Sequence, residues 1–304
     1  MVWTPTLGWF EVHDLSDAVL ALTGSTPKVT QFTSAKASSQ WSASTTWGNN
    51  NNPNISSVLD LANNIGGSQE VVVDTQANAY SLRIQGSGGD MRVMVNTDSS
   101  LSVLTSMQVG AGGDLHLSSG SSLNTGQLSI NSGGNLRGSG HIFAPASCGV
   151  NQACVDVGGT VSPGNSPGTL TITGNVGFEA TGVLQIELAG TTQGTNYDLL
   201  SIAGNTTLAG TLQVSLLSDF TPQPGDTFRV LTATAISGQF STLSLPTLAS
   251  DRRWNVLYGS DALTLAVVSV PEPSTLAALS VVVLLGVALN PIRQRSIVSE
   301  VTRT

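Results

Sequence analysis

The sequence predicts an all-β protein, a parallel β-helix (solenoid) with a C-terminal β cap, followed by a single C-terminal hydrophobic helix. Three observations support this prediction. The chain of 304 residues contains 33 glycines and only 10% charged residues, against roughly 25% in an ordinary globular domain. Short runs rich in β-branched residues recur between small-residue turns, which is typical of strands. One uncharged apolar run lies near the C-terminus.

Residues 1–69 are predicted to form a mixed N-terminal cap. Within them, Trp41 and Trp47 precede a run of asparagines that ends at Pro53, a composition that interrupts regular structure. The two indole rings would either plug the open end of a stack of strands or form a platform on which a sugar stacks. We favour the plug, because the terminal units of repeat stacks need a cap.

Residues 70–215 are predicted to form the β-helical repeat region. After four β-branched runs, apolar–polar–apolar triplets recur every 12 to 16 residues or so, with one wider gap. The triplets begin at Leu115, Leu128, Val155, Leu170, Leu184, Leu200 and Leu212. Because side chains alternate along a strand, each triplet sends two apolar groups inward and one polar group outward. A solenoid fits better than a sandwich, since the turns are not Asn-Gly hairpins and few aromatic residues are available for a sandwich core.

Residues 216–269 are predicted to form the C-terminal β cap that closes the last repeat. A Pro-x-Pro-Gly-Asp turn leads into an expected strand at residues 227–231, and a second strand is expected at residues 262–268. Most of the large apolar side chains of the chain lie in this segment.

Residues 270–295 have three parts in order. The first is the polar motif Val270, Pro271, Glu272, Pro273 and Ser274, whose prolines end the preceding strand. The second is an uncharged run, in which we expect a helix that engages the membrane because a completed β domain leaves no core to cover it. The third is a pair of arginines, which favour the inner side of a membrane. The expected anchor residues are Leu276, Val281, Leu284, Leu285, Leu289, Arg293 and Arg295. Residues 296–304 form a polar tail.

This tail resembles the PEP-CTERM sorting domain in the Val-Pro-Glu-Pro-Ser motif, the apolar helix and the arginine cluster. The resemblance implies export, an exosortase-type membrane protease as partner, and release or attachment at the cell surface, often in a biofilm or extracellular matrix. A second resemblance concerns residues 158–175, which are similar to the passenger-associated repeat of autotransporter β-helices. Its recognisable part is the Pro-Gly-Asn-Ser-Pro-Gly turn at residues 163–168, and it implies a β-helical stalk.

Cys148 and Cys154 lie close together in a loop rich in Gly, Pro and Ser. A disulfide between them is the favoured interpretation and fits an oxidising compartment. A metal or redox pair is the alternative, although the spacing is not C-x-x-C and no cluster of histidines accompanies it. The first residues of the chain show no signal peptide, since no basic segment precedes an apolar core there.

The composition and motifs indicate neither a nucleic-acid partner nor catalysis. The net charge of −8 disfavours phosphate binding. His13, His116 and His141 have no metal-ligand spacing, and no nucleophile elbow, phosphate-binding loop or dinucleotide fingerprint occurs. Asp114 and Asp156 are outward-facing candidates for the carboxylates of a polysaccharide-degrading enzyme, but aspartates at turns are commonplace. We therefore expect no catalytic residues, no metal and no cofactor.

Together these features predict a non-catalytic surface or extracellular-matrix protein, located at the cell surface or outside the cell and membrane-anchored at least transiently. Its β-helical body would serve adhesion or structural spacing. The alternative is a polysaccharide-binding or polysaccharide-degrading β-helix, with exopolysaccharide as the partner. A third hypothesis is an intracellular protein with a chance tail, in which the two cysteines stay reduced.

Overall fold

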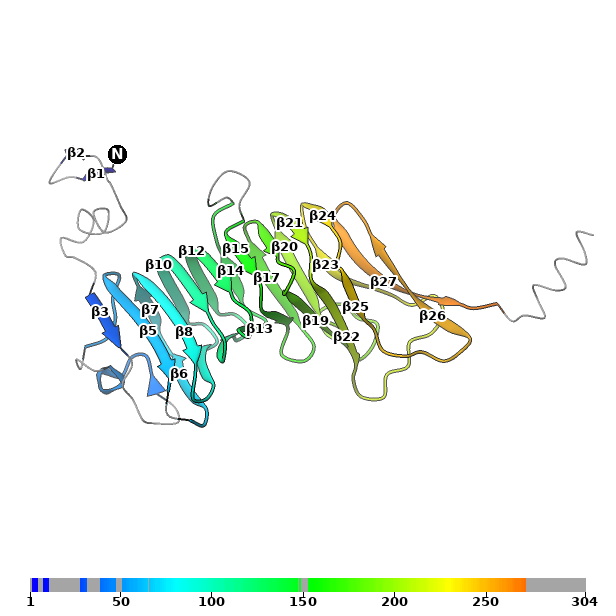
Figure 1. Ribbon diagram of the computed structural model, residues 1–304, viewed down its shortest axis with the longest axis horizontal. Helices are drawn as coiled ribbons and strands as arrows, with labels where there is room; N and C mark the ends of the chain where they lie inside the picture. Colours follow the sequence, from blue (N-terminus) through cyan, green and yellow to red (C-terminus); the bar gives the residue numbers. More distant parts are fainter. Residues whose placement is uncertain are drawn as a thin grey trace, which may run out of the picture.

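The structure, a computed structural model, describes residues 2–4, 8–10, 28–31, 39–47, 51–64, 66–146, 148 and 153–271. Within these residues the regular secondary structure is β-strand apart from one short 3-10 helix, η1 (Ser44–Thr46), and there is no α-helix. The prediction of an all-β protein is confirmed. From β3 to the β26–β27 hairpin, the strands lie side by side along the long axis of the molecule, and the chain advances along this axis (Figure 1). The expected C-terminal helix and the polar tail at residues 296–304 lie outside the described residues.

The described strands form one nine-stranded sheet, one sixteen-stranded sheet and a separate antiparallel pair. The nine-stranded sheet is parallel throughout. Its strands are β4 (Ser39–Gln40), β6 (Gln69–Val73), β9 (Met91–Val95), β11 (Gly113–Leu117), β13 (Asn135–Gly138), β16 (Thr160–Pro163), β19 (Val183–Leu188), β22 (Thr211–Leu216) and β25 (Thr242–Ser244). The separate pair is β1 (Val2–Thr4) with β2 (Gly8–Phe10).

The sixteen-stranded sheet is parallel except at its C-terminal hairpin, where β26 pairs with β27 and β27 pairs with β23 in antiparallel fashion. Its strands are β3 (Lys28–Gln31), β5 (Ser57–Asn63), β7 (Gln76–Ala79), β8 (Ser81–Gly86), β10 (Ser100–Val109), β12 (Ser122–Ile130), β14 (His141–Phe143), β15 (Val155–Val157), β17 (Thr169–Thr173), β18 (Val176–Phe178), β20 (Leu199–Ala203), β21 (Asn205–Leu208), β23 (Thr227–Thr232), β24 (Ala235–Gly238), β26 (Arg252–Tyr258) and β27 (Ala262–Ser269).

The chain passes between the two sheets in a fixed order. After each strand of the nine-stranded sheet from β13 to β22, it contributes two strands to the sixteen-stranded sheet before it returns, as in β16, β17, β18 and then β19. In β12 one long strand fills both places, because its first half pairs with β14 and its second half with β15. Each strand therefore pairs with the strand that occupies the same place one repeat later.

The core lies between the sheets and follows the alternation predicted from the triplets. All seven triplets lie within strands, and none of their apolar side chains is more than 6% exposed. The central polar residues, such as His116 and Asp156, are partly exposed on the outer faces. Since burying one aliphatic side chain contributes about 1.5–3 kcal/mol, the inward rows account for most of the favourable free energy of folding.

Aromatic side chains gather near the two ends of the strand stack. At the N-terminal end, Trp41 and Trp47 are each 1% exposed, and their rings meet edge to face with centroids 4.9 Å apart. The sugar-platform alternative for them is therefore wrong, because neither ring face is open to solvent. Toward the other end, Phe228 contacts Tyr197, Phe220 and Trp254 edge to face.

The parallel pairing begins before residue 70, because β5 pairs with β8 and β4 with β6. It also continues past residue 215, because β23, β24 and β25 each extend a parallel row. Only the β26–β27 hairpin after them is antiparallel. The strands expected at residues 227–231 and 262–268 are present as β23 and β27.

Candidate ligand-binding groove

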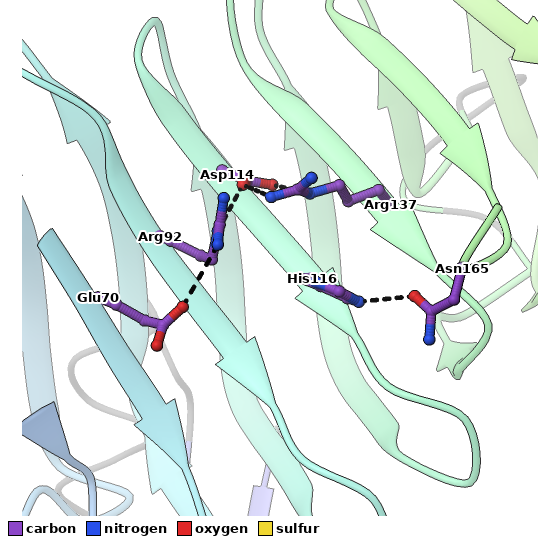
Figure 2. A network of polar contacts seen from close by, with 6 residues as sticks. All are labelled: Glu70, Arg92, Asp114, His116, Arg137 and Asn165. Carbon is purple, nitrogen blue, oxygen red and sulfur yellow. Dashed lines mark hydrogen bonds and ion pairs between the residues drawn. The ribbon is translucent and has the colours of Figure 1, made fainter. Parts of the chain in front are cut away.

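The outer face of the nine-stranded sheet carries a row of alternating charges (Figure 2). Arg92 Nε donates to Asp114 Oδ2 at 2.8 Å, and Arg92 Nη1 lies 3.5 Å from Glu70 Oε2. From the other side, Arg137 donates through Nε to Asp114 Oδ1 at 2.9 Å and through Nη2 to Asp114 Oδ2. The Asp114 carboxylate is 12% exposed and is held between two guanidinium groups.

Strand register places these charges together. Glu70 is opposite Arg92, and Arg92 is opposite Asp114, in the parallel pairing of β6, β9 and β11. Neighbours in the row are 22 or 23 residues apart in sequence. The hydrogen bond to Asp114, more than any other contact, raises the pKa of Arg92. The network therefore alternates acidic and basic side chains, two of each, so their charges largely cancel.

A groove with a volume of about 670 Å³ begins at this network and runs over β11, β13, β16, β19 and β22. The turn at residues 163–168 stands over it, and Asn165 Oδ1 of that turn lies 2.8 Å from His116 Nε2 (Figure 2). The other lining side chains are mainly amides and hydroxyls, among them Ser162, Gln185 and Gln213, together with the carboxylate of Glu187. None of the described residues that line the groove is a phenylalanine, tyrosine or tryptophan.

Asp198 fixes the base of the 163–168 turn. Its side chain is buried, with 1% of the residue exposed, and it accepts hydrogen bonds from the backbone N–H of Gly168 through Oδ1 and of Glu187 through Oδ2, both at 2.8 Å. Gly164 has a φ of +91°, and a Cβ at that position would lie 2.7 Å from Asp198 Oδ1. Glycine is therefore required there both for the backbone conformation and for the space that Asp198 occupies.

Burial raises the pKa of the Asp198 carboxyl from 3.8 to about 7. The two backbone N–H groups favour the charged form and oppose this shift, but the loss of hydration outweighs them. The protonation of Asp198 consequently changes near neutral pH. The enclosed carboxyl contacts the turn through the backbone N–H of Gly168.

The groove is chemically suited to binding by hydrogen bonds. Of its three carboxylates, Asp114 is neutralised by its arginines and Asp198 is enclosed, so only Glu187 faces the groove without an ion-pair partner among the described residues. Among the described residues, no group of three or more His, Cys, Asp or Glu gathers as a metal site. His141 stacks on Phe143 on the other sheet, with ring centroids 3.8 Å apart, and its Nε2 lies 2.8 Å from Thr173 Oγ1.

Most of the tail residues singled out from the sequence fall beyond the described part. Val270 and Pro271 are exposed directly after β27. The residues outside the described part are Glu272, Pro273, Ser274, Leu276, Val281, Leu284, Leu285, Leu289, Arg293 and Arg295. In the part of the chain that is described, no helix has the length and apolar character needed to span a membrane.

Cys148 and Cys154 are joined by a disulfide between the ends of β14 and β15 on the side of the sixteen-stranded sheet. Cys154 is fully buried, and Cys148 is exposed, with its Sγ 3.1 Å from the carbonyl oxygen of Gly126 in β12.

Two features of the groove were missed by sequence reasoning. The charge row has a detectable signal, since Glu70, Arg92, Asp114 and Arg137 alternate in sign at the repeat interval. Asp156, the other outward-facing candidate, lies on the sixteen-stranded sheet and receives a hydrogen bond from Gln127, so the structure does not bring it to Asp114. Asp198 has no such signal, because a single aspartate before an apolar run does not show that its carboxylate is buried.

Comparison with models of known protein families finds no match to this chain, and comparison with curated proteins finds no match either.

Proposed function

We propose that this protein is a non-catalytic, exported surface or extracellular-matrix protein whose body is a parallel β-helix used for adhesion or structural spacing. The observation that carries the proposal is the repeating parallel pairing of both sheets, with aliphatic rows inside and polar rows outside. Such a body gains stability repeat by repeat and holds its two ends far apart. It therefore suits a role in which one end is fixed and the length or the side surface is used.

Two features support a location outside the cytoplasm. The Cys148–Cys154 disulfide is typical of oxidising compartments. The motif from Val270 to Ser274, followed by the apolar run and the arginines, resembles a PEP-CTERM sorting signal, whose partner would be an exosortase-type protease and the membrane. The exposure of Val270 and Pro271 beyond the last strand fits access by such a protease.

The absence of catalysis is supported by the chemistry of the groove. Glycoside hydrolysis needs a pair of carboxylic groups that act as acid and base or nucleophile. Of the three carboxylates that line the groove, Asp114 is held by two arginines and Asp198 by two backbone N–H groups, so Glu187 is left without a second free carboxylate beside it. The specific observation that favours the second candidate, polysaccharide binding, is the polar groove itself.

The test is fractionation of native cells combined with mass spectrometry of the C-terminal peptide. We expect the protein in the surface or extracellular fraction, with the sequence after the Pro-Glu-Pro motif removed. The double variant Glu272→Ala, Pro273→Ala should stay unprocessed in the membrane. The control variant Glu179→Ala removes an acidic side chain at an exposed position elsewhere and should behave as wild type. Full-length protein in the cytosol with reduced Cys148 and Cys154 would overturn the proposal.

A further inference from the structure

The groove over β11 to β22 presents hydrogen-bonding groups at the spacing of the strands. Gln185 and Gln213 are register partners, and Ser162 Oγ donates to Gln185 Oε1 at 2.7 Å. Arg137 is the register partner of Ser162 on one side and of His116 on the other, so both continue the same row. Neighbouring strands lie ~4.8 Å apart, so this row repeats a polar group about once per 4.8 Å. That interval is close to the length of one pyranose unit in an extended, ribbon-like polysaccharide.

The length of the groove matches a short stretch of such a chain. Its floor spans five strands, from β11 to β22, which is roughly 19 Å at the usual strand separation. About four sugar units would therefore lie along the row. The bound chain would run across the strands, because polar groups recur at the strand separation only in that direction.

The chemistry of the lining points to an uncharged ligand. Carboxamide and hydroxyl groups both donate and accept hydrogen bonds, as sugar hydroxyls do. The positive charge of Arg137 is neutralised by Asp114, and Glu187 has no cationic partner among the described residues. A polyanion would meet the charge of Glu187 without compensation. A protein partner is disfavoured because the lining offers no apolar centre of the kind found in protein interfaces.

We propose that this groove binds an extended, uncharged polysaccharide of the β-1,4-linked type, lying across β11 to β22 with about one sugar unit per strand. The inference deepens the adhesive function proposed above, on which it rests, by naming the class of ligand. The 163–168 turn covers one side of the bound chain, and Asn165 and His116 fix the position of that turn. Binding depends on many weak hydrogen bonds, so it grows with the length of the oligosaccharide.

The test is isothermal titration of the purified protein with cellohexaose, mannohexaose and xylohexaose. Laminarihexaose, whose β-1,3 linkage does not give an extended ribbon, and polygalacturonate, which is anionic, serve as comparison ligands. We expect at least one of the three β-1,4 probes to bind, and to bind more tightly than either comparison ligand.

The matched variants use the two sheets of the same repeats. Gln185→Ala with Gln213→Ala removes the amides from the groove and should weaken binding by about tenfold or more. Thr171→Ala with Ser201→Ala removes outward hydroxyls from register partners on the sixteen-stranded sheet and should leave binding unchanged. Unchanged circular dichroism and unfolding midpoints in both variants would show that they fold.

The proposal is overturned if no β-1,4 probe binds, if polygalacturonate binds more tightly than all three, or if the groove variant binds as wild type does. These measurements use purified protein, so their failure leaves export and sorting untouched. Failure of the fractionation experiment, in turn, leaves the affinity measured here unaffected.

Discussion

The two outer faces of the molecule differ although the interior behind them is the same. On the nine-stranded sheet the outer face carries the Glu70–Arg92–Asp114–Arg137 row and the polar groove. On the sixteen-stranded sheet it carries separate ion pairs, such as Asp60 with Arg83, and exposed apolar side chains such as Leu104 and Phe143. Inward residues on both sheets are aliphatic and buried. The inward residues therefore determine the stability of the fold, whereas the outward residues of each sheet can differ without changing it.

The largest expected effect tests whether the interior is equivalent behind both faces. Leu136 in β13 and Leu170 in β17 are both fully buried. Truncation of either, as Leu136→Ala or Leu170→Ala, should lower the free energy of unfolding by about 3 kcal/mol, because a cavity is left. Urea unfolding followed by circular dichroism measures this, with Thr171→Ala as the outward control. A marked difference between the two leucine variants would break the equivalence.

Next, at up to ~1.4 kcal/mol for each pH unit, is the pH dependence that Asp198 gives to the groove side. Its folded pKa is about 7 and its ordinary value 3.8, so between these values the folded state keeps a proton that the unfolded state has lost. The stability contribution is complete below pH 4 or so and is lost as the pH rises through about 7, at a slope of at most ~1.4 kcal/mol per pH unit. Unfolding free energies of wild type and Asp198→Asn should diverge over this range. Parallel curves would show that burial does not hold the proton.

The disulfide lies against the sixteen-stranded sheet, so its removal tests whether a change on that face affects the groove on the other face. Its two cysteines are six residues apart in sequence, and closing so short a loop stabilises the folded state by about 2 kcal/mol. Cys148→Ser with Cys154→Ser should cost about this amount, measured by thermal unfolding. Oligosaccharide binding by this variant should match wild type, and a loss of binding would mean that the two faces are coupled.

The smallest expected effect is the difference in unfolding free energy lost when each of the two sets of ion pairs is broken. Asp114→Ala leaves two guanidinium groups without their shared partner and should cost about 1–2 kcal/mol. Asp60→Ala removes a pair whose carboxylate and guanidinium are 30% and 49% exposed, and should cost ~0–1 kcal/mol. Raising the salt concentration should reduce the difference between these two stability costs only slightly, because Asp114 is largely shielded from solvent. Equal costs in low salt would show that the row acts as separate surface pairs.

The amount of structure predictable from the sequence follows from what a local pattern encodes. The triplets at Leu115 and Leu184 predict where the strands lie and which side chains point inward, because the alternation of side chains is a property of each strand alone. The pairing of Arg92 with Asp114 depends on register over a whole repeat, which the interval of 22 residues indicates only if the repeat length is already known. The enclosure of Asp198 beneath the 163–168 turn depends on contacts 30 residues apart and leaves no local pattern.

The growth of the repeat along the chain has a further consequence. Partners in the charge row are 22 or 23 residues apart, whereas Gln185 and Gln213 are 28 apart, yet the strands that carry them pair without a register shift on one sheet. The additional residues are held in the connections between strands. Insertions and deletions at those corners can therefore accumulate during evolution without shifting a row of side chains. A protein built this way can change the outline of its edges while it keeps an aligned face.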